Sequence, residues 1–162
     1  MITKTKHSRE WRILLNPAFC GEIIRNAIKE YEKHDEKGLS FTLVFFILPL
    51  ILHPDTYNKI QNRRQGQFFG WLDKQFLFNI DLDERIKLLK KVTLESISFL
   101  AFFNAIKITN GKIQTVDFDL YDDSQKYKPY MQKYQDKAIQ VGRWLGQSPS
   151  LSTLYFMLGV RP

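Results

Sequence analysis

The chain has 162 residues, the length of a single domain, since one domain usually takes about 100–200 residues. Its 24 Lys and Arg residues outnumber its 17 Asp and Glu residues and give a formal net charge of +7, while 44% of all residues are hydrophobic. So much hydrophobic sequence excludes a disordered chain, and the single cysteine, Cys20, excludes a disulfide scaffold. We therefore expect one basic, aromatic-rich globular domain over residues 1–162.

The N-terminal segment, residues 1–10, is polar and basic, and we expect it to be flexible. No apolar core of a signal peptide follows it, so we expect a cytoplasmic protein. The most apolar stretch, residues 39–52, is shorter than the roughly 20 residues that a membrane span needs. This stretch therefore predicts a helix buried in the core and no membrane span.

The first long helix should begin at Asn16-Pro17, where a capping side chain is followed by proline at the first helical position. Gly38 should end this helix or the turn after it. Ser40 can cap a second helix over residues 41–52, and Pro49 inside that helix should kink it.

His53 stands before Pro54, a position biased towards an extended backbone, so the second helix should end there. Pro54 then opens a short helix that reaches about Ile60. Residues 62–67 read as a basic loop, and residues 68–75 read as another short helix.

Residues 81–118 predict a helix-turn-helix with a wing. Asp81 and Glu84 have the spacing of a capping box at the start of one helix. Val92-Thr93 is a predicted break, after which Thr93 caps a second helix over residues 94–106. Asn110-Gly111 accepts the positive φ angles of a two-residue turn, so the chain from Ile106 to Phe118 is predicted to be a hairpin.

A pair of helices is predicted over residues 125–159. The first carries an apolar stripe from Tyr127 to Leu145 and ends at Gly146. Ser148-Pro149 starts the second helix, and Gly159 ends it. The expected fold class is thus mostly α with a small β-hairpin, in the form of a winged helix-turn-helix-like helical domain.

Catalytic and metal-binding motifs are sparse in this sequence. It has no Gly-rich phosphate loop followed by Lys-Ser/Thr, and Cys20 with three scattered histidines lacks the ligand spacing of a zinc site. A nucleophilic pair of Cys20 and His53 is conceivable, although Cys20 falls on the apolar half of a helix, where cysteine usually acts as a small hydrophobe. We expect a protein that is not an enzyme and holds no cofactor or metal.

Basic residues are the remaining signal, and they suggest contact with the phosphates of double-stranded DNA. The helix expected over residues 94–104 has no Arg or Lys, so it lacks donors for reading base edges. Its three phenylalanines favour burial in the core or in a protein partner. Nonspecific phosphate contact through the loop and the wing is the hypothesis, and mere solvation of these cations is the alternative. The candidate contacts are Arg63, Arg64, Lys107 and Lys112.

Several segments resemble the small middle component of bacterial three-component ABC systems, a group that overlaps the Lamassu anti-phage defence systems. One is Asn16-Pro17-Ala18-Phe19-Cys20, and a second runs from Leu48 to Pro54. The others are Gly142-Arg143-Trp144-Leu145 and Leu158-Gly159-Val160-Arg161-Pro162. The resemblance extends from about residue 11 to the end of the sequence, and its specificity comes from the order and spacing of these segments.

This resemblance implies a non-catalytic adaptor. In such systems an ATPase of the SMC/RecN kind hydrolyses nucleotide and engages DNA, and an effector that is often a nuclease supplies the toxic output. The middle component holds the two together or docks on the ATPase. The implied partners are therefore an SMC/RecN-like ATPase subunit and a nuclease-like effector subunit.

The C-terminal segment is the candidate partner-binding site. Arg143 and Trp144 can present a charged, stacking pair of the type that is enriched in interface hot spots. The alternative is that Trp144 packs the final helix pair and Arg161 is only solvated. The candidate residues are Arg143, Trp144, Val160, Arg161 and Pro162.

Two other classes of function stay open on the sequence. A stand-alone winged-helix DNA-binding regulator would bind a particular duplex tightly and with strong salt dependence. A small enzyme that uses Cys20 is the third class, and it is excluded if a Cys20→Ser variant keeps full function.

Overall fold

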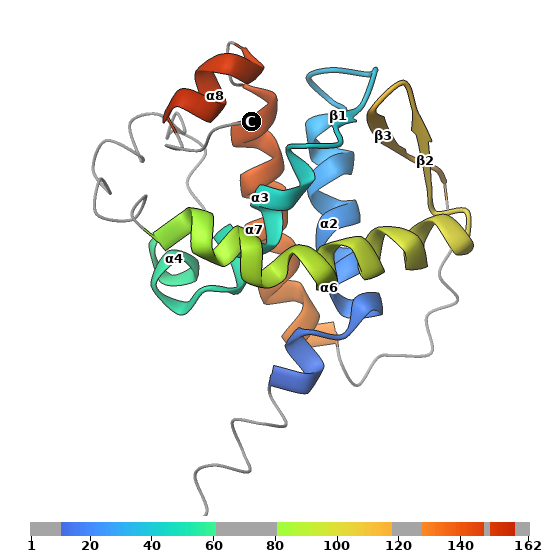
Figure 1. The fold of residues 1–162 in the computed structure, drawn as a ribbon. Helices are drawn as coiled ribbons and strands as arrows, with labels where there is room; N and C mark the ends of the chain where they lie inside the picture. Colours follow the sequence, from blue (N-terminus) through green and yellow to red (C-terminus); the bar gives the residue numbers. More distant parts are fainter. Residues whose placement is uncertain (1–10, 61–80, 118–127, 148–149, 158–162) are drawn as a thin grey trace, which may run out of the picture.

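The computed structural model of the chain describes residues 11–60, 81–117, 128–147 and 150–157. They form a mostly helical fold with one small antiparallel sheet (Figure 1), which confirms the predicted class of mostly α with a hairpin. The described helices are α2 (Pro17–Tyr31), α3 (Val44–Leu52), α4 (Pro54–Lys59), α6 (Leu82–Phe102), α7 (Lys128–Gly146) and α8 (Leu151–Met157), and the strands are β1 (Leu39–Ser40), β2 (Ile106–Thr109) and β3 (Lys112–Thr115).

Helix α2 lies at the centre of the fold, packed against α7, α6 and α3. It begins where the sequence predicts, because the Oδ1 atom of Asn16 accepts a hydrogen bond from the backbone N–H of Ala18 at 2.8 Å and Pro17 takes the first helical position. Figure 1 shows α6 crossing in front of both α2 and α7, which run side by side behind it. The buried apolar side chains of α2 include Ile23, Ile24 and Ile28.

Gly142 brings the backbones of α2 and α7 into direct contact. A Cβ atom at this position would lie 2.2 Å from the carbonyl oxygen of Ala27 and 3.0 Å from its Cα atom. Only glycine leaves room for so close an approach. The crossing of the two helices is therefore fixed by a residue without a side chain.

Helix α3 fills the core, as predicted, and all of its residues except Phe45 are buried. Pro49 lies within it, and the helix ends at His53, whose backbone is extended (φ −80°, ψ 125°). The predicted start was wrong: α3 begins at Val44 and has no side-chain cap, because Ser40 belongs to a strand. Within the described ranges, no helix combines the length and the hydropathy that crossing a membrane requires.

The predicted break at Val92-Thr93 is wrong, because α6 is one continuous helix of 21 residues. Both residues are buried, and the Thr93 hydroxyl donates to the carbonyl of Leu89 at 2.8 Å instead of capping a new helix. Packing of this face thus overrides the weak helix propensity of two β-branched residues. One helix, α6, therefore replaces the two helices that were expected before the hairpin. The likeness to a winged helix stays a prediction.

Asn104 ends α6 earlier than the sequence analysis expects. Its φ of 55° lies in the left-handed region. The N–H of Asn104 donates to the carbonyl of Ala101, and the N–H of Ala105 donates to the carbonyl of Leu100 at 2.9 Å. This pair of hydrogen bonds is a Schellman motif. At the other end, Asp81 occupies the N-cap position, but its side chain makes no capping hydrogen bond.

The hairpin at Asn110-Gly111 is confirmed. The two residues have φ angles of 52° and 72°, as a two-residue hairpin turn requires, and β2 pairs with β3. A third strand that was not predicted completes the sheet: β1 pairs with β3 through Leu39 and Ile113, which gives the order β1-β3-β2.

The C-terminal helix pair is present as α7 and α8. The cap of α8 is Ser150, whose Oγ atom accepts from the N–H of Thr153 at 3.1 Å, and the predicted starter Ser148-Pro149 falls outside the described residues. So do the N-terminal segment 1–10, the basic loop and short helix within 61–80, and the predicted helix stop at Gly159. The single-domain organisation over 1–162, with a unit at 81–118 and another at 125–159, stays a prediction.

Candidate partner-binding surface

Three aromatic side chains lie at the surface near the C-terminal end of α6, and we call them the phenylalanine cluster: Phe99, Phe102 and Phe103. Phe102 is 81% exposed, and the other two are also exposed. Their rings pack on one another, with centroids 4.8 Å apart for Phe99 and Phe103 and 5.2 Å apart for Phe102 and Phe103. Grouped aromatic side chains left in water are typical of interaction surfaces.

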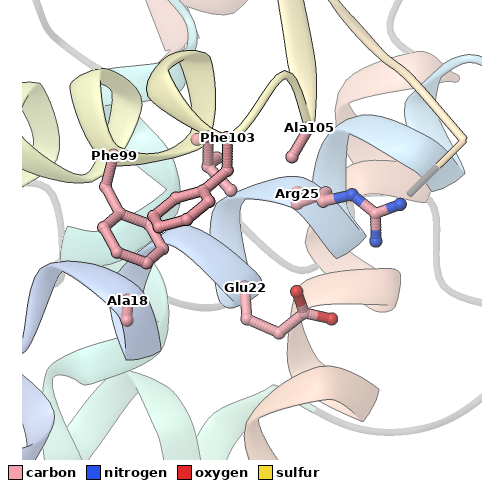
Figure 2. Close-up of a pocket in the computed structure, with 7 residues that line it drawn as sticks. Ala18, Glu22, Arg25, Phe99, Phe103 and Ala105 are labelled. Carbon is pink, nitrogen blue, oxygen red and sulfur yellow. The ribbon is translucent and has the colours of Figure 1, made fainter. Parts of the chain in front are cut away.

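A pocket of about 200 Å³ lies between this cluster and α2. Figure 2 shows the rings of Phe99 and Phe103 pointing from α6 towards Ala18 and Glu22 on α2. Apolar side chains form most of the wall, and Glu22 and Arg25 are its charged members. The full lining is Ala18, Glu22, Arg25, Phe99, Leu100, Phe103 and Ala105.

Arg25 is the unusual member of this lining, because it is only 8% exposed. One of its terminal nitrogens donates to the carbonyl of Val116 at 3.3 Å, and among the described residues its Nε atom has no hydrogen-bond partner. Glu22 is engaged elsewhere, since its carboxylate accepts from the side-chain amide of Asn26 at 2.9 Å. A buried cation without a full set of acceptors is costly to hold in an apolar site.

The sequence points to the three phenylalanines as core or partner-facing residues, but it does not indicate Arg25, Ala18 and Glu22. One signal was present, because Arg25 interrupts the apolar run of α2 between Ile24 and Ala27. The pocket itself needs two helices that are far apart in the sequence, and no local pattern indicates it.

The structure ties two of the predicted partner-binding residues into the chain itself. The Nε and terminal nitrogen atoms of Arg143 donate to one carboxylate oxygen of Glu30 at 3.1 and 3.0 Å. Trp144 is 3% exposed and belongs to the core, which is where the alternative placed it. Val160, Arg161 and Pro162 lie outside the described residues, so their contact with a partner stays a prediction.

The candidate phosphate-contacting residues differ in their surroundings. Lys107 is exposed on β2, whereas the Nζ atom of Lys112 forms an ion pair with Asp35 at 2.9 Å. Phosphate binding at Lys112 would therefore compete with a carboxylate. Arg63 and Arg64 lie outside the described residues, and DNA contact by all four residues stays a prediction.

Cys20 is fully buried, and its Sγ atom donates to the carbonyl of Leu14 at 2.9 Å. Burial raises the pKa of the thiol from 9.0 to about 12, and a hydrogen bond with Ser96 lowers it only in part. The described ranges hold no group of three or more metal-ligating side chains around Cys20 or elsewhere. The environment of Cys20 is that of a core residue and not that of a nucleophile.

We expect an aromatic disulfide reagent at pH 8 to leave the native chain unlabelled, because the raised pKa keeps the thiol protonated and burial blocks access. In denaturant, the same reagent should label one thiol per chain, since Cys20 is the only cysteine. The absorbance of the released thiolate measures both. Rapid stoichiometric labelling of the folded chain would contradict the assignment of Cys20 to the core.

Comparison with known families identifies the chain. The family model described as ABC-three component (ABC-3C) system Middle Component 3 matches residues 4–162. No curated protein and no solved structure gives a match.

The chain is therefore a component of an ABC-three component system. Within that class it belongs to the Middle Component 3 family, because the match covers nearly all of its length. The resemblance to a middle component is thereby confirmed.

Proposed function

We propose that this chain is a non-catalytic adaptor subunit of an SMC-like ABC ATPase complex of the Lamassu type, which acts in anti-phage or anti-plasmid defence. It docks on the SMC/RecN-like ATPase and links it to a nuclease-like effector. The observation that carries the proposal is the family match over residues 4–162, because a middle component implies further components that it joins.

The surface of the described residues supports an adaptor. The phenylalanine cluster and the pocket beneath it offer an apolar site that a partner protein can cover. The exposed Lys107 and the net charge of +7 support an additional nonspecific contact with DNA phosphates in the cytoplasm. That contact would position the complex on DNA without reading its sequence.

Co-expression tests this function. A tagged copy of the chain, produced together with the two proteins encoded beside it, should be purified as a complex that contains the ATPase. Omitting each neighbour in turn identifies the subunit on which the chain docks, and size-exclusion chromatography with mass determination gives the composition.

Recovery of the chain alone as a monomer would contradict the adaptor proposal. If that monomer also bound one particular DNA duplex tightly and lost the binding steeply with added salt, the stand-alone regulator would be supported instead.

A further inference from the structure

Two lysines lie on one face of the β2–β3 hairpin. Lys112 pairs across the strands with Thr109, and Lys107 lies two residues before Thr109 on β2. Because side chains alternate between the two faces of a sheet, all three residues share one face, and the two lysines are diagonal neighbours on it. Ile106 and Ile113 occupy the other face and are buried. Figure 1 shows the hairpin at the edge of the fold, with its turn pointing away from α6.

The two lysines differ in what holds them. Lys107 is exposed and forms no ion pair with any residue that the structure describes. Lys112 is 35% exposed, and its Nζ atom lies 2.9 Å from the Oδ2 atom of Asp35. One cation of this face is therefore available to a phosphate, whereas the charge of the other is already neutralised by a carboxylate.

Asp35 is held in position for this contact. Its Oδ1 atom accepts from the backbone N–H of Lys37 at 3.0 Å, which leaves Oδ2 for Lys112. The hydrogen bond from Lys112 lowers the pKa of this carboxyl from its ordinary value of 3.8, so the carboxyl is ionised at neutral pH. The ion pair is thus already formed in the isolated chain.

Other contacts hold the loop that carries Asp35 against β3. The side-chain amide of Gln114 donates to the carbonyl of Glu36 at 2.7 Å, and the backbone N–H of Thr115 donates to the carboxylate of Glu32 at 2.6 Å. These bonds are independent of the ion pair, so the pair can open by rotation of the lysine side chain alone. Partly exposed ion pairs are weak, which lets a polyanion compete for the lysine.

We propose that Asp35 is an autoinhibitory carboxylate, which occupies Lys112 and holds the hairpin at reduced affinity for the phosphates of duplex DNA. Lys107 stays available throughout, and Lys112 joins it only when a phosphate displaces Asp35. The inference rests on the phosphate contact in the proposed function and adds to it the residue that weakens that contact.

The test compares two substitutions that each remove one negative charge. Asp35→Asn abolishes the ion pair and keeps an oxygen that accepts from the N–H of Lys37. Glu36→Gln is the matched control, because Glu36 is the neighbouring residue, is exposed and forms no ion pair with the described residues. Fluorescence anisotropy of a short labelled duplex of arbitrary sequence gives the affinity of the full chain at several salt concentrations.

We expect Asp35→Asn to bind the duplex about fivefold more tightly than the unchanged chain, which is the upper end of what an exposed ion pair contributes. The slope of log affinity against log salt concentration should steepen by about 0.9, as one additional phosphate contact requires. Glu36→Gln should gain less than about twofold and keep the slope of the unchanged chain.

Lys112→Gln shows whether the gain passes through the lysine. In a chain that already carries Lys112→Gln, Asp35→Asn should gain no more affinity than Glu36→Gln does. Equal gains from Asp35→Asn and Glu36→Gln in the unchanged chain would overturn the inference, and so would a full gain without Lys112. If the unchanged chain and Asp35→Asn both fail to bind the duplex at low salt, the phosphate contact of the proposed function is itself contradicted, so the two failures are distinguishable.

Discussion

Replacing Gly142 with alanine is expected to lower the free energy of unfolding of the chain by about 3 kcal/mol, at the upper end of the usual cost of overpacking a core. The new Cβ atom would lie 2.2 Å from the carbonyl oxygen of Ala27. The Cβ atom is fixed to the backbone of α7, and the atoms that it meets belong to the backbone of α2. The clash is therefore relieved only by moving α7 away from α2. Urea unfolding followed by circular dichroism measures the loss.

Gly21→Ala is the matched control for this prediction. A Cβ atom on Gly21 would lie 3.3 Å from the Cγ atom of Leu100, a side chain that can shift. The helix gains about 0.5–1 kcal/mol when glycine is replaced by alanine, so we expect a change in unfolding free energy of less than about 1 kcal/mol. Equal losses from Gly142→Ala and Gly21→Ala would contradict the close backbone contact.

Arg143→Ala is expected to destabilise the isolated chain by about 2–3 kcal/mol at pH 7, because it leaves the buried carboxylate of Glu30 with one cation fewer. The remaining partner, Lys33, is exposed to solvent, and Lys33→Ala should cost less than about 1 kcal/mol, as exposed ion pairs usually do. Urea unfolding of both variants gives the comparison.

The pH dependence of Arg143→Ala follows from Glu30. Burial raises the pKa of this carboxyl, but hydrogen bonds and charges from Lys33 and Arg143 outweigh burial and hold the pKa below its ordinary value of 4.5. A lowered pKa contributes stability that is present above about pH 4.5 and is lost as the pH falls through the folded value. The stability difference between the unchanged chain and Arg143→Ala should therefore narrow at more acidic pH.

The same variant distinguishes a structural from a partner-binding role for Arg143. If Arg143→Ala unfolds like the unchanged chain at every pH but fails to join the complex, the side chain contacts a partner, as the sequence analysis suggested. A loss of stability in the isolated chain assigns Arg143 to the contact between α7 and α2.

Local signals in the sequence were sufficient for the parts of the fold that depend on neighbouring residues. Asn16-Pro17 predicts the start of α2, Asn110-Gly111 predicts the hairpin turn, and His53 before Pro54 predicts the end of α3. In each case the backbone preference of the residues themselves decides the outcome.

The remaining features depend on contacts that are distant in the sequence. Leu39 reads as the start of the apolar stretch before the buried helix, but pairing with Ile113 draws it into a sheet. Thr93 reads as a cap, but a bond to the preceding turn satisfies its hydroxyl inside α6. Arg25 acquires its place in the pocket only when α6 crosses α2. The phenylalanines could therefore be assigned from the sequence to the core or to a protein partner, but the pocket beside them could not be predicted.

The packing of α2 on α7 also affects how the chain emerges from the ribosome. Helix α2 ends at Tyr31, whereas α7 is complete only at Gly146. At the usual rate of about 5–20 residues per second, α2 waits about 6–23 seconds for this neighbour. During that time the face of α2 around Ala27 has no α7 to cover it, and a chain interrupted before α7 would keep that face open. The nascent chain therefore exposes this surface until α7 is made, and exposed apolar surface in an incomplete chain favours premature association.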